Sequence, residues 1–382
     1  MKTKPAAIFD GDAFPILKQG LYANHAAIAP WPRVTTQAVC DFAVENGETG
    51  AEKYASWLLR ETHLRQHLAR LIHADSANDI ALLKNTTEGI CTVAAGIRWH
   101  NGDNVVIPAD EFPSNRLPWL ALAQLGVEVR EVNIRDTEHP EQALLSHMDQ
   151  NTRLLSVSAI QWTDGLRLDL KTLGESCKNN RVFFFVDAIQ QAGAMQIDVE
   201  ACHIDFLAAD GHKWLLSPEG IAVFYCREDK REQLQLGQVG WHMVDEPYQF
   251  NRQDWKPSQS ATRFEAGTPN MLGQAAMFAS IKLLLETGMP VIEALITDNS
   301  RCLYNGILDI PGLEPLRPFD PERVSGIISF RPGNGNPLAL HTALKRRGVT
   351  CAIRGEGIRL SPHYYQADEP IHQLLNIIEQ TT

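Results

Sequence analysis

The sequence lacks the cysteine pattern of a disulfide-stapled protein. Its seven cysteines lie singly along 382 residues, and no two of them form a C-x-x-C motif. An odd number of scattered cysteines is typical of a protein from a reducing compartment, where thiols stay reduced. We therefore expect a cytoplasmic protein that is held together by its hydrophobic core rather than by disulfides.

An excess of positive charge and a long apolar run are also missing. The 35 Lys and Arg residues stand against 46 Asp and Glu residues, so the net charge is -11. Nucleic acids and anionic membranes attract basic surfaces, and neither is an expected partner. No apolar stretch is long enough to cross a bilayer, and Asp10 and Asp12 interrupt the N-terminal one before it resembles a signal peptide.

The sequence has no internal repeats, which excludes solenoid folds. It also has no G-x-G-x-x-G motif after a strand, so it lacks the fingerprint of a dinucleotide-binding fold. What remains is an alternation of short apolar runs, such as "NVVIP", "RLLSVSAI" and "RVFFFV", with helical patterns. This alternation predicts a mostly parallel sheet covered by helices on both faces. The pattern changes near residues 255–275, which predicts a large domain over 15–265 and a smaller α/β domain over 266–382, with the segment 1–14 packing on the smaller one.

The stretch "RVFFFVDAIQQAG" places Asp187 where a buried strand ends. Ligands of open α/β sheets bind outside the carboxyl ends of the strands, so an acid at this point is a candidate for function. The alternative is that Asp187 caps the helix that follows the strand.

A second apolar run, "FLAAD", leads directly into His212 and Lys213. Lysine is seldom buried without a partner, and a desolvated lysine has a lowered pKa that suits it to form a Schiff base. The alternative is a lysine on a surface turn. A third candidate is "KNTTEG", where Thr86 and Thr87 begin a predicted helix whose free amides suit a phosphate, although helix capping explains the same residues.

A lysine for a Schiff base, an acid at a strand end and a phosphate-ready helix start together indicate pyridoxal 5'-phosphate (PLP). An acid facing the pyridine nitrogen keeps the ring protonated, and the protonated ring withdraws electrons from the substrate Cα. This interpretation explains why Asp187 stands at the end of an apolar strand.

At these residues the sequence resembles the class V aminotransferases and cysteine desulfurase-like proteins of the fold-type I PLP enzymes. The likeness runs from "YANHAAIAPWP" to "GIRLSPHYY", and its most specific parts are "VDAIQQAG", "GHKW..SPEG" and "TRFEAGTPN". The resemblance implies a large domain with a mostly parallel seven-stranded sheet sandwiched by helices, and a smaller C-terminal α/β domain.

The same resemblance assigns roles to individual residues. It implies that Lys213 forms the Schiff base, that Asp187 pairs with the ring nitrogen and that Gln190 lies near the phenolic oxygen of the cofactor. It also implies that Thr86 and Thr87 bind the cofactor phosphate, that Phe112 stacks on the cofactor ring and that His212 is catalytic. The substrate-binding positions that it implies are Asn24, His25, Arg354 and Arg359. Of the two arginines, Arg354 is favoured for the substrate carboxylate because it ends a short strand. Thr268 would reach the cofactor phosphate of a neighbouring subunit, which implies a homodimer.

Three departures from the desulfurase pattern bear on the reaction. Phe112 stands where the family commonly has a histidine, Asp210 stands where desulfurases often have a phosphate-binding serine, and "RPGNGNPLALHTALKRRGV" has no cysteine for a persulfide. We expect transamination of an α-amino acid through an external Schiff base and Cα-proton removal. The alternatives are a carbon-sulfur or carbon-selenium β-lyase, an epimerase, and a PLP-fold scaffold without catalysis. His63 and His67 lie four residues apart but lack a third ligand, so no metal site is expected.

Overall fold

The structure is a computed structural model that describes residues 11–333, 335–366 and 368–382. Within these residues, seven strands form the central sheet in the order β2-β8-β7-β6-β5-β3-β4. The strands are β2 (Ile80–Leu83), β3 (Asn104–Pro108), β4 (Glu128–Val132), β5 (Thr152–Ser158), β6 (Phe183–Asp187), β7 (Phe206–Asp210) and β8 (Ala222–Cys226). All neighbours pair in parallel except β8, which runs antiparallel to both β2 and β7. The prediction of a mostly parallel seven-stranded sheet is confirmed.

Successive residues of the central strands enter two different cores, because side chains on a strand point alternately to opposite faces. In β6, Phe183 and Phe185 belong to one core, whereas Phe184 and Val186 belong to the other. This two-sided burial explains why "VFFFV" is apolar without interruption and does not alternate with polar residues.

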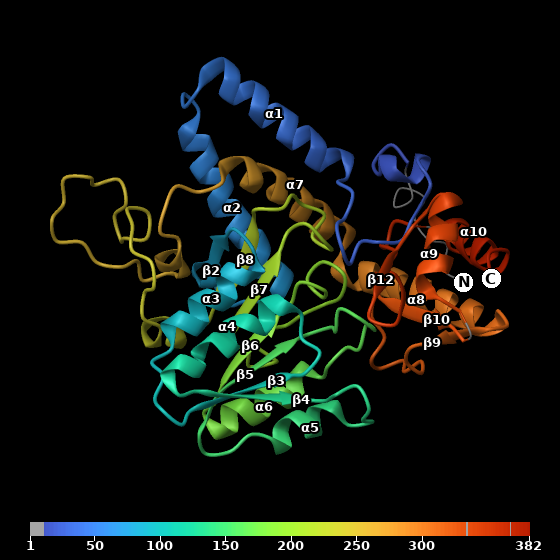
Figure 1. The fold of residues 1–382 in the computed structure, drawn as a ribbon. Helices are drawn as coiled ribbons and strands as arrows, with labels where there is room; N and C mark the ends of the chain where they lie inside the picture. Colours follow the sequence, from blue (N-terminus) through green and yellow to red (C-terminus); the bar gives the residue numbers. More distant parts are fainter. Residues whose placement is uncertain (1–10, 334, 367) are drawn as a thin grey trace.

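Helices cover both faces of the sheet (Figure 1). The large domain contains α1 (Arg33–Thr49), α2 (Tyr54–Ile72), α3 (Thr86–Gly96), α4 (Leu117–Leu120), α5 (Pro140–Ser146) and α6 (Leu170–Asn180). Residues of α3 and α4 pack into the core that holds Phe185, while residues of α2 and α6 pack into the core that holds Phe184.

The C-terminal part of the chain forms a second α/β unit, drawn in orange and red in Figure 1. Its elements are α8 (Met289–Asp309), β9 (Leu313–Pro315), β10 (Ile328–Pro332), α9 (Pro337–Arg346), β11 (Val349–Thr350), β12 (Ala352–Arg354), β13 (Gly357–Leu360) and α10 (Asp368–Glu379). An antiparallel sheet has the order β12-β13-β10-β9. The short strand β1 (Leu21–Tyr22) pairs in parallel with β11, so an N-terminal segment joins this unit.

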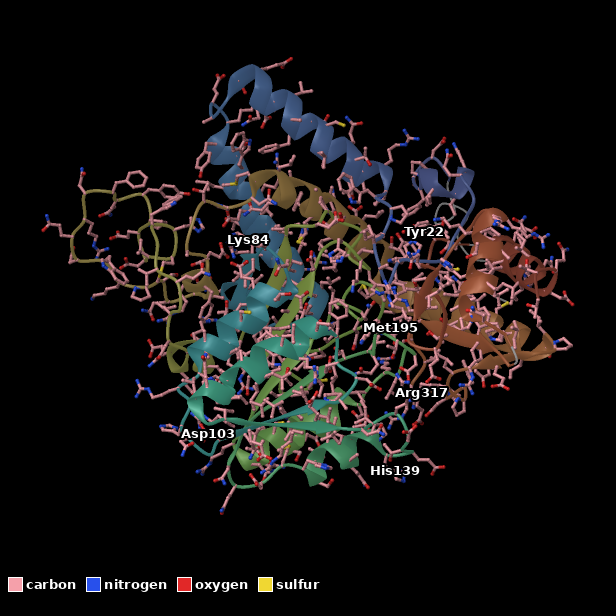
Figure 2. The ribbon with its side chains drawn as sticks, viewed as in Figure 1. Tyr22, Lys84, Asp103, His139, Met195 and Arg317 are labelled. Atoms are coloured by element: carbon pink, nitrogen blue, oxygen red, sulfur yellow. The ribbon has the colours of Figure 1, made fainter. Side chains whose placement is uncertain are left out.

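The helix α7 (Met271–Thr287) lies at the predicted domain boundary and packs on α1 and α2. The division of the chain at residues 265 and 266 stays a prediction, and residues 1–10 of the segment 1–14 lie outside the described residues. In Figure 2, the labelled residues Tyr22, Met195 and Arg317 follow the border between the two units.

Within the described residues, no single helix is both long and apolar enough to cross a membrane; α7 and α8 pass that test only as a pair, bent by 83°.

Candidate active site

A cavity of about 410 Å³ lies at the edge of the sheet where the carboxyl ends of several strands meet. Because β8 is antiparallel to both of its neighbours, β2 and β7 run in the same direction and end at this edge with β3, β5 and β6. The cavity is lined by residues that follow these strands and by the β12–β13 hairpin of the smaller unit. This is the place where open α/β sheets bind their ligands.

Lys213 and Asp187 both line this cavity, although 26 residues separate them in the sequence. Asp187 is 2% exposed, and one of its oxygens accepts a hydrogen bond of 3.0 Å from the backbone N–H of Ile189. Burial raises the pKa of Asp187 to about 6, against the opposing charge of Lys213. Burial lowers the pKa of Lys213 to about 8, with a further contribution from nearby arginines. The amine therefore has a substantial neutral fraction near pH 8, which a nucleophile requires.

A glycine permits the loop after Asp187 to lie against the loop that carries Lys213. Gly193 has φ of +91°, and a Cβ built on it would lie 2.3 Å from the carbonyl oxygen of Trp214. Any side chain at this position would push the two loops apart. The last residue of "VDAIQQAG" thus keeps the acid and the lysine in one cavity.

The first turn of α3 forms another wall of the cavity. Asn85 caps this helix, since its side chain accepts a hydrogen bond of 2.9 Å from the N–H of Glu88. The hydroxyl of Thr86 accepts from the N–H of Asp210 at 3.0 Å, and the hydroxyl of Thr87 donates to Ser114 at 2.9 Å. Backbone amides and hydroxyls at a helix N-terminus are well suited to bind a phosphate.

Asp210 is a buried acid in the cavity wall. Its Oδ1 lies 3.1 Å from Nδ1 of His212, which lines the same wall. Neither of these two atoms has a hydrogen-bond partner among the described residues, so their proximity is not a hydrogen bond.

Gln190 and Phe112 also line the cavity. The side chain of Gln190 donates to the carbonyl of Ala26 at 3.1 Å and accepts from the indole N–H of Trp214 at 2.9 Å, so its orientation is fixed. Phe112 is 41% exposed, and its ring centroid lies 5.8 Å from Nζ of Lys213. The aromatic face of Phe112 is thus available beside the lysine.

Two arginines of the β12–β13 hairpin reach the same cavity. Arg359 is 1% exposed, donates to the carbonyl of Trp162 at 2.7 Å, and leaves Nε and one Nη without a partner among the described residues. Burial lowers its pKa to about 9. Arg354 is partly buried and donates to the carbonyl of Ile353 at 2.8 Å.

These residues fit PLP and an amino acid. The orphaned guanidinium nitrogens of Arg359 call for an anion, because a buried donor without a partner is unfavourable. The start of α3 offers amides and hydroxyls for a phosphate, and the desolvated Lys213 offers an amine.

A family model described as aminotransferase class-V matches residues 22–376 of this sequence. The chain belongs to the class-V aminotransferase family. This class-V enzyme is similar to a protein of Methanothermobacter thermautotrophicus named "Probable cysteine desulfurase", with 32% identity over 96% of each chain. It is also 27% identical to the isopenicillin N epimerase of Streptomyces clavuligerus over 94% of each chain.

Two solved structures have the same fold. A structure of the cystine C–S lyase C-DES with its reaction product cysteine persulfide has a TM-score of 0.89 and 25% identity, over 96% of this chain and 99% of that one. A C-DES variant with glycine covalently linked to its PLP cofactor has a TM-score of 0.90 and 24% identity, over 97% and 99%. The fold-type I prediction is confirmed, and this class-V enzyme uses PLP as its cofactor. Membership in an enzyme family stands against the scaffold alternative.

Most of the site residues that the class-V resemblance implies lie in one place. The residues that line the cavity are Thr86, Thr87, Phe112, Asp187, Gln190, His212, Lys213, Arg354 and Arg359. Three others do not line it. His25 is fully buried with its ring nitrogens bonded to the carbonyl of Ser361 and the hydroxyl of Tyr365. Asn24 forms an isolated β-bridge with Ser361, and Thr268 lies exposed in a separate depression.

Glu111 does not line the cavity, but it is a buried acid close enough to Asp187 to sense its charge, and sequence reasoning missed it. It accepts hydrogen bonds from the N–H of Ser158 at 2.6 Å, from the hydroxyl of Ser158, and from the side chain of Gln161 at 3.3 Å. Burial raises the pKa of Glu111 to about 7, and the charge of Asp187 adds to this. Its position just after β3 follows the same strand-end rule that identified Asp187, so the sequence did contain a signal.

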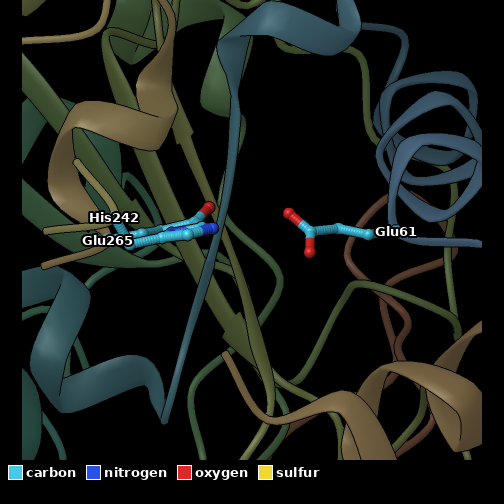
Figure 3. A group of neighbouring side chains, drawn as sticks. All are labelled: Glu61, His242 and Glu265. Atoms are coloured by element: carbon cyan, nitrogen blue, oxygen red, sulfur yellow. The ribbon is translucent and has the colours of Figure 1, made fainter. Parts of the chain in front are cut away.

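A second group of buried titratable residues lies away from the cavity. Figure 3 shows the carboxylate of Glu61 directed toward His242 and Glu265, whose possible ligand atoms all lie within 4.8 Å of one another. Arg65 donates to both glutamates, with 2.8 Å to one oxygen of Glu265. A guanidinium bound to both acids repels a cation and offsets one of their two negative charges, so the group ties α2 to the segment before α7.

Proposed function

We propose that this class-V enzyme cleaves the Cβ–S bond of a sulfur-containing α-amino acid, with Lys213 as the base. One observation carries the proposal: a lysine with a lowered pKa, a buried acid and an arginine with unpaired donors line one cavity. The resemblance to a cystine C–S lyase supports the choice of sulfur as the leaving atom.

The residues of the cavity divide the work by chemistry. PLP, when bound, supplies the aldehyde carbon that joins the amino group and a ring that withdraws electrons from Cα. Asp187 holds the ring nitrogen protonated, the start of α3 at Thr86 and Thr87 binds the phosphate, and Phe112 packs on the ring face. Arg359 binds the α-carboxylate through its free Nε and Nη. We assign this role to Arg359 and not to Arg354, which the sequence favours, because only Arg359 is fully buried with unpaired donors.

The proposed reaction requires one base and one bond cleavage. Nζ of Lys213 takes the Cα proton, the Cβ–S bond breaks, and the sulfur leaves with the electron pair as a thiolate or persulfide. Hydrolysis of the remaining three-carbon unit yields pyruvate and ammonia. No oxidant or reductant is needed.

The cavity favours this lyase over a desulfurase that forms a protein persulfide. None of the described residues that line it is a cysteine. Cys351, the thiol closest in sequence to the arginines, is buried, and burial raises its pKa to about 12, so it is not a thiolate at neutral pH. Phe112 cannot exchange a proton, which disfavours an epimerase that uses bases on both faces of the cofactor. Transamination, the first expectation from sequence, needs only Lys213 and stays the second candidate.

We also propose a cytoplasmic homodimer. All seven cysteines are free, which suits a reducing compartment. The segment 234–260, seen in yellow in Figure 1, extends from the body, and Phe250 and Trp255 on it are 75% and 50% exposed. Exposed apolar groups of this size are typical of a protein interface. Thr268 lies outside the cavity of its own chain and is free to approach that of a partner.

Product analysis tests the proposed reaction. The purified enzyme with PLP is incubated with cystine, cysteine and S-methylcysteine, and pyruvate, persulfide and the cofactor spectrum are followed. We expect pyruvate and the sulfur product in equal amounts with the original spectrum restored, and no product from Lys213→Ala. Conversion of the cofactor to its amine form without sulfur release would establish transamination instead. Exchange of the Cα proton with solvent and inversion without sulfur release would establish epimerisation.

A further inference from the structure

The two arginines of the cavity lie on one face of a single hairpin. Strands β12 and β13 are antiparallel, with Ala352 opposite Arg359 and Arg354 opposite Gly357. Arg354 is two residues from Ala352 and therefore shares its face, which is also the face of Arg359. Diagonal neighbours of this kind have backbones roughly 7–8 Å apart, a spacing that long side chains still span, so both guanidinium groups reach one cavity. Two positive charges there are one more than a single carboxylate neutralises.

The charges of the two arginines are not offset by acidic side chains of the described residues. Among the described residues, no carboxylate forms an ion pair with Arg354 or Arg359. Their proximity has an electrostatic signature, because the charge of Arg354 helps burial to lower the pKa of Arg359. Like charges this close are unfavourable unless an anion lies between or beside them.

The proposed function already assigns the other charged sites of the cavity. Asp187 serves the ring nitrogen, the start of α3 serves the phosphate, and Asp210 is an acid that cannot attract an anion. The α-carboxylate of the substrate matches Arg359. One partly buried guanidinium that lines the cavity, that of Arg354, remains without an assigned anion.

We propose that Arg354 binds a second anionic group, so that the substrate is an amino acid with a carboxylate at the far end of its side chain. This inference rests on the proposed function, in which Arg359 holds the α-carboxylate. Cystine and cystathionine are amino acids of this class, since each has a carboxylate at both ends, whereas S-methylcysteine has only one. The hairpin thus selects the substrate because Arg359 binds its α-carboxylate and Arg354 binds its distal carboxylate.

Binding titrations test the inference without relying on turnover. The absorbance change of the PLP-loaded enzyme is followed as cystine, cystathionine or S-methylcysteine is added. For Arg354→Gln we expect the apparent Kd of cystine and cystathionine to rise about 10- to 100-fold, the usual loss for a charge-assisted contact. The Kd of S-methylcysteine should change less than about twofold. Arg359→Gln is the matched comparison and should weaken all three ligands.

Three outcomes overturn the inference while leaving the proposed function intact. An equal loss of all three ligands in Arg354→Gln would place Arg354 on the α-carboxylate. Unchanged binding of all three would exclude it from the substrate site. A loss of PLP affinity, measured by equilibrium dialysis, would assign it to the phosphate. A fourth outcome is separate: if no amino acid changes the spectrum of the loaded wild-type enzyme, the proposed function fails and this inference fails with it.

Discussion

At the scale of single residues, burial tunes the reactive pair. Lys213 and Asp187 are both desolvated, so the lysine pKa falls and the aspartate pKa rises, each toward neutrality. The two groups oppose these shifts through their mutual attraction. Lys213 is therefore an amine that can react near neutral pH. Asp187 is an acid whose carboxylate form is favoured by a neighbouring cation.

The pH dependence of PLP uptake follows from this tuning. Only the neutral amine of Lys213 reacts, so the rate at which PLP-free enzyme takes up the cofactor should rise with pH and level off above about 8. Asp187→Asn removes a negative charge that raises the lysine pKa, and the midpoint should move to lower pH. Stopped-flow absorbance measures both profiles. A midpoint near 10.5 would contradict the burial of the amine.

Glu111 makes a second prediction at this scale. Glu111→Ala removes the acceptor of two donors of Ser158 and one of Gln161, which should lower the free energy of unfolding by at least about 2 kcal/mol. Glu111→Gln keeps the shape and should cost less. The exposed Glu48→Gln is a control and should have no measurable effect. Denaturant titration gives all three values.

The raised pKa of Glu111 also determines how the free energy of unfolding changes with pH. From the ordinary pKa of 4.5 to about 7, the folded chain keeps a proton that the unfolded chain has lost, so stability falls as pH rises through this window. Wild type should lose up to about 3 kcal/mol between pH 4.5 and 7 that Glu111→Gln does not lose. A constant difference between the two proteins from pH 4.5 to 8 would refute the shift.

At the scale of elements, the position of the helix α3 depends on its close approach to the sheet. A Cβ on Gly89 would lie 2.8 Å from Cβ of Ala208 on β7 and 3.1 Å from the ring of Phe224 on β8. This close approach delivers the first turn of α3, with Thr86, to the end of β7. Spacing in the sequence alone does not reveal that contact.

Gly89→Ala should therefore push α3 away from the sheet. We expect a loss of about 1–3 kcal/mol in the free energy of unfolding and a weaker PLP affinity, because overpacking displaces the turn that we propose binds the phosphate. Gly47→Ala in α1 is the matched control, since a Cβ there meets nothing within 4 Å. It should stabilise the protein by about 0.5–1 kcal/mol and leave PLP affinity unchanged. Similar behaviour of the two variants would remove the packing argument.

At the scale of the whole molecule, the proposed dimer makes two chains share one site. Lys213→Ala removes the lysine from a cavity, whereas Thr268→Ala removes a phosphate ligand from the cavity of the partner. Mixed dimers of the two variants contain one cavity with both defects and one cavity with neither. We expect co-refolded chains to regain tight PLP binding and activity in about a quarter of all sites, measured by spectroscopic titration. A mixture that only sums its separate variants would contradict the sharing of sites.

The sequence determined much of this protein because certain properties are local. Uninterrupted apolar runs of β-branched and aromatic residues specify buried parallel strands, and Asp187, Lys213 and Thr86 are recognisable because each follows such a run. The carboxyl ends of parallel strands lie at one edge of a sheet, so the sequence alone predicts that these three residues are neighbours. Glu111 obeyed the same rule, but one acid after a strand looks like any surface residue until its donors are seen.

Only the tertiary structure decided how distant segments meet. The hairpin of Arg354 and Arg359 reaches a cavity built from strands more than a hundred residues earlier, and the burial that distinguishes the two arginines depends on that meeting. His25 and Asn24 were predicted for the site, but they do not line the cavity, and both contact Ser361 of the C-terminal unit instead. Composition and spacing specify which residues suit a strand or a turn. The desolvation of a given side chain depends instead on packing between segments that are distant in the sequence.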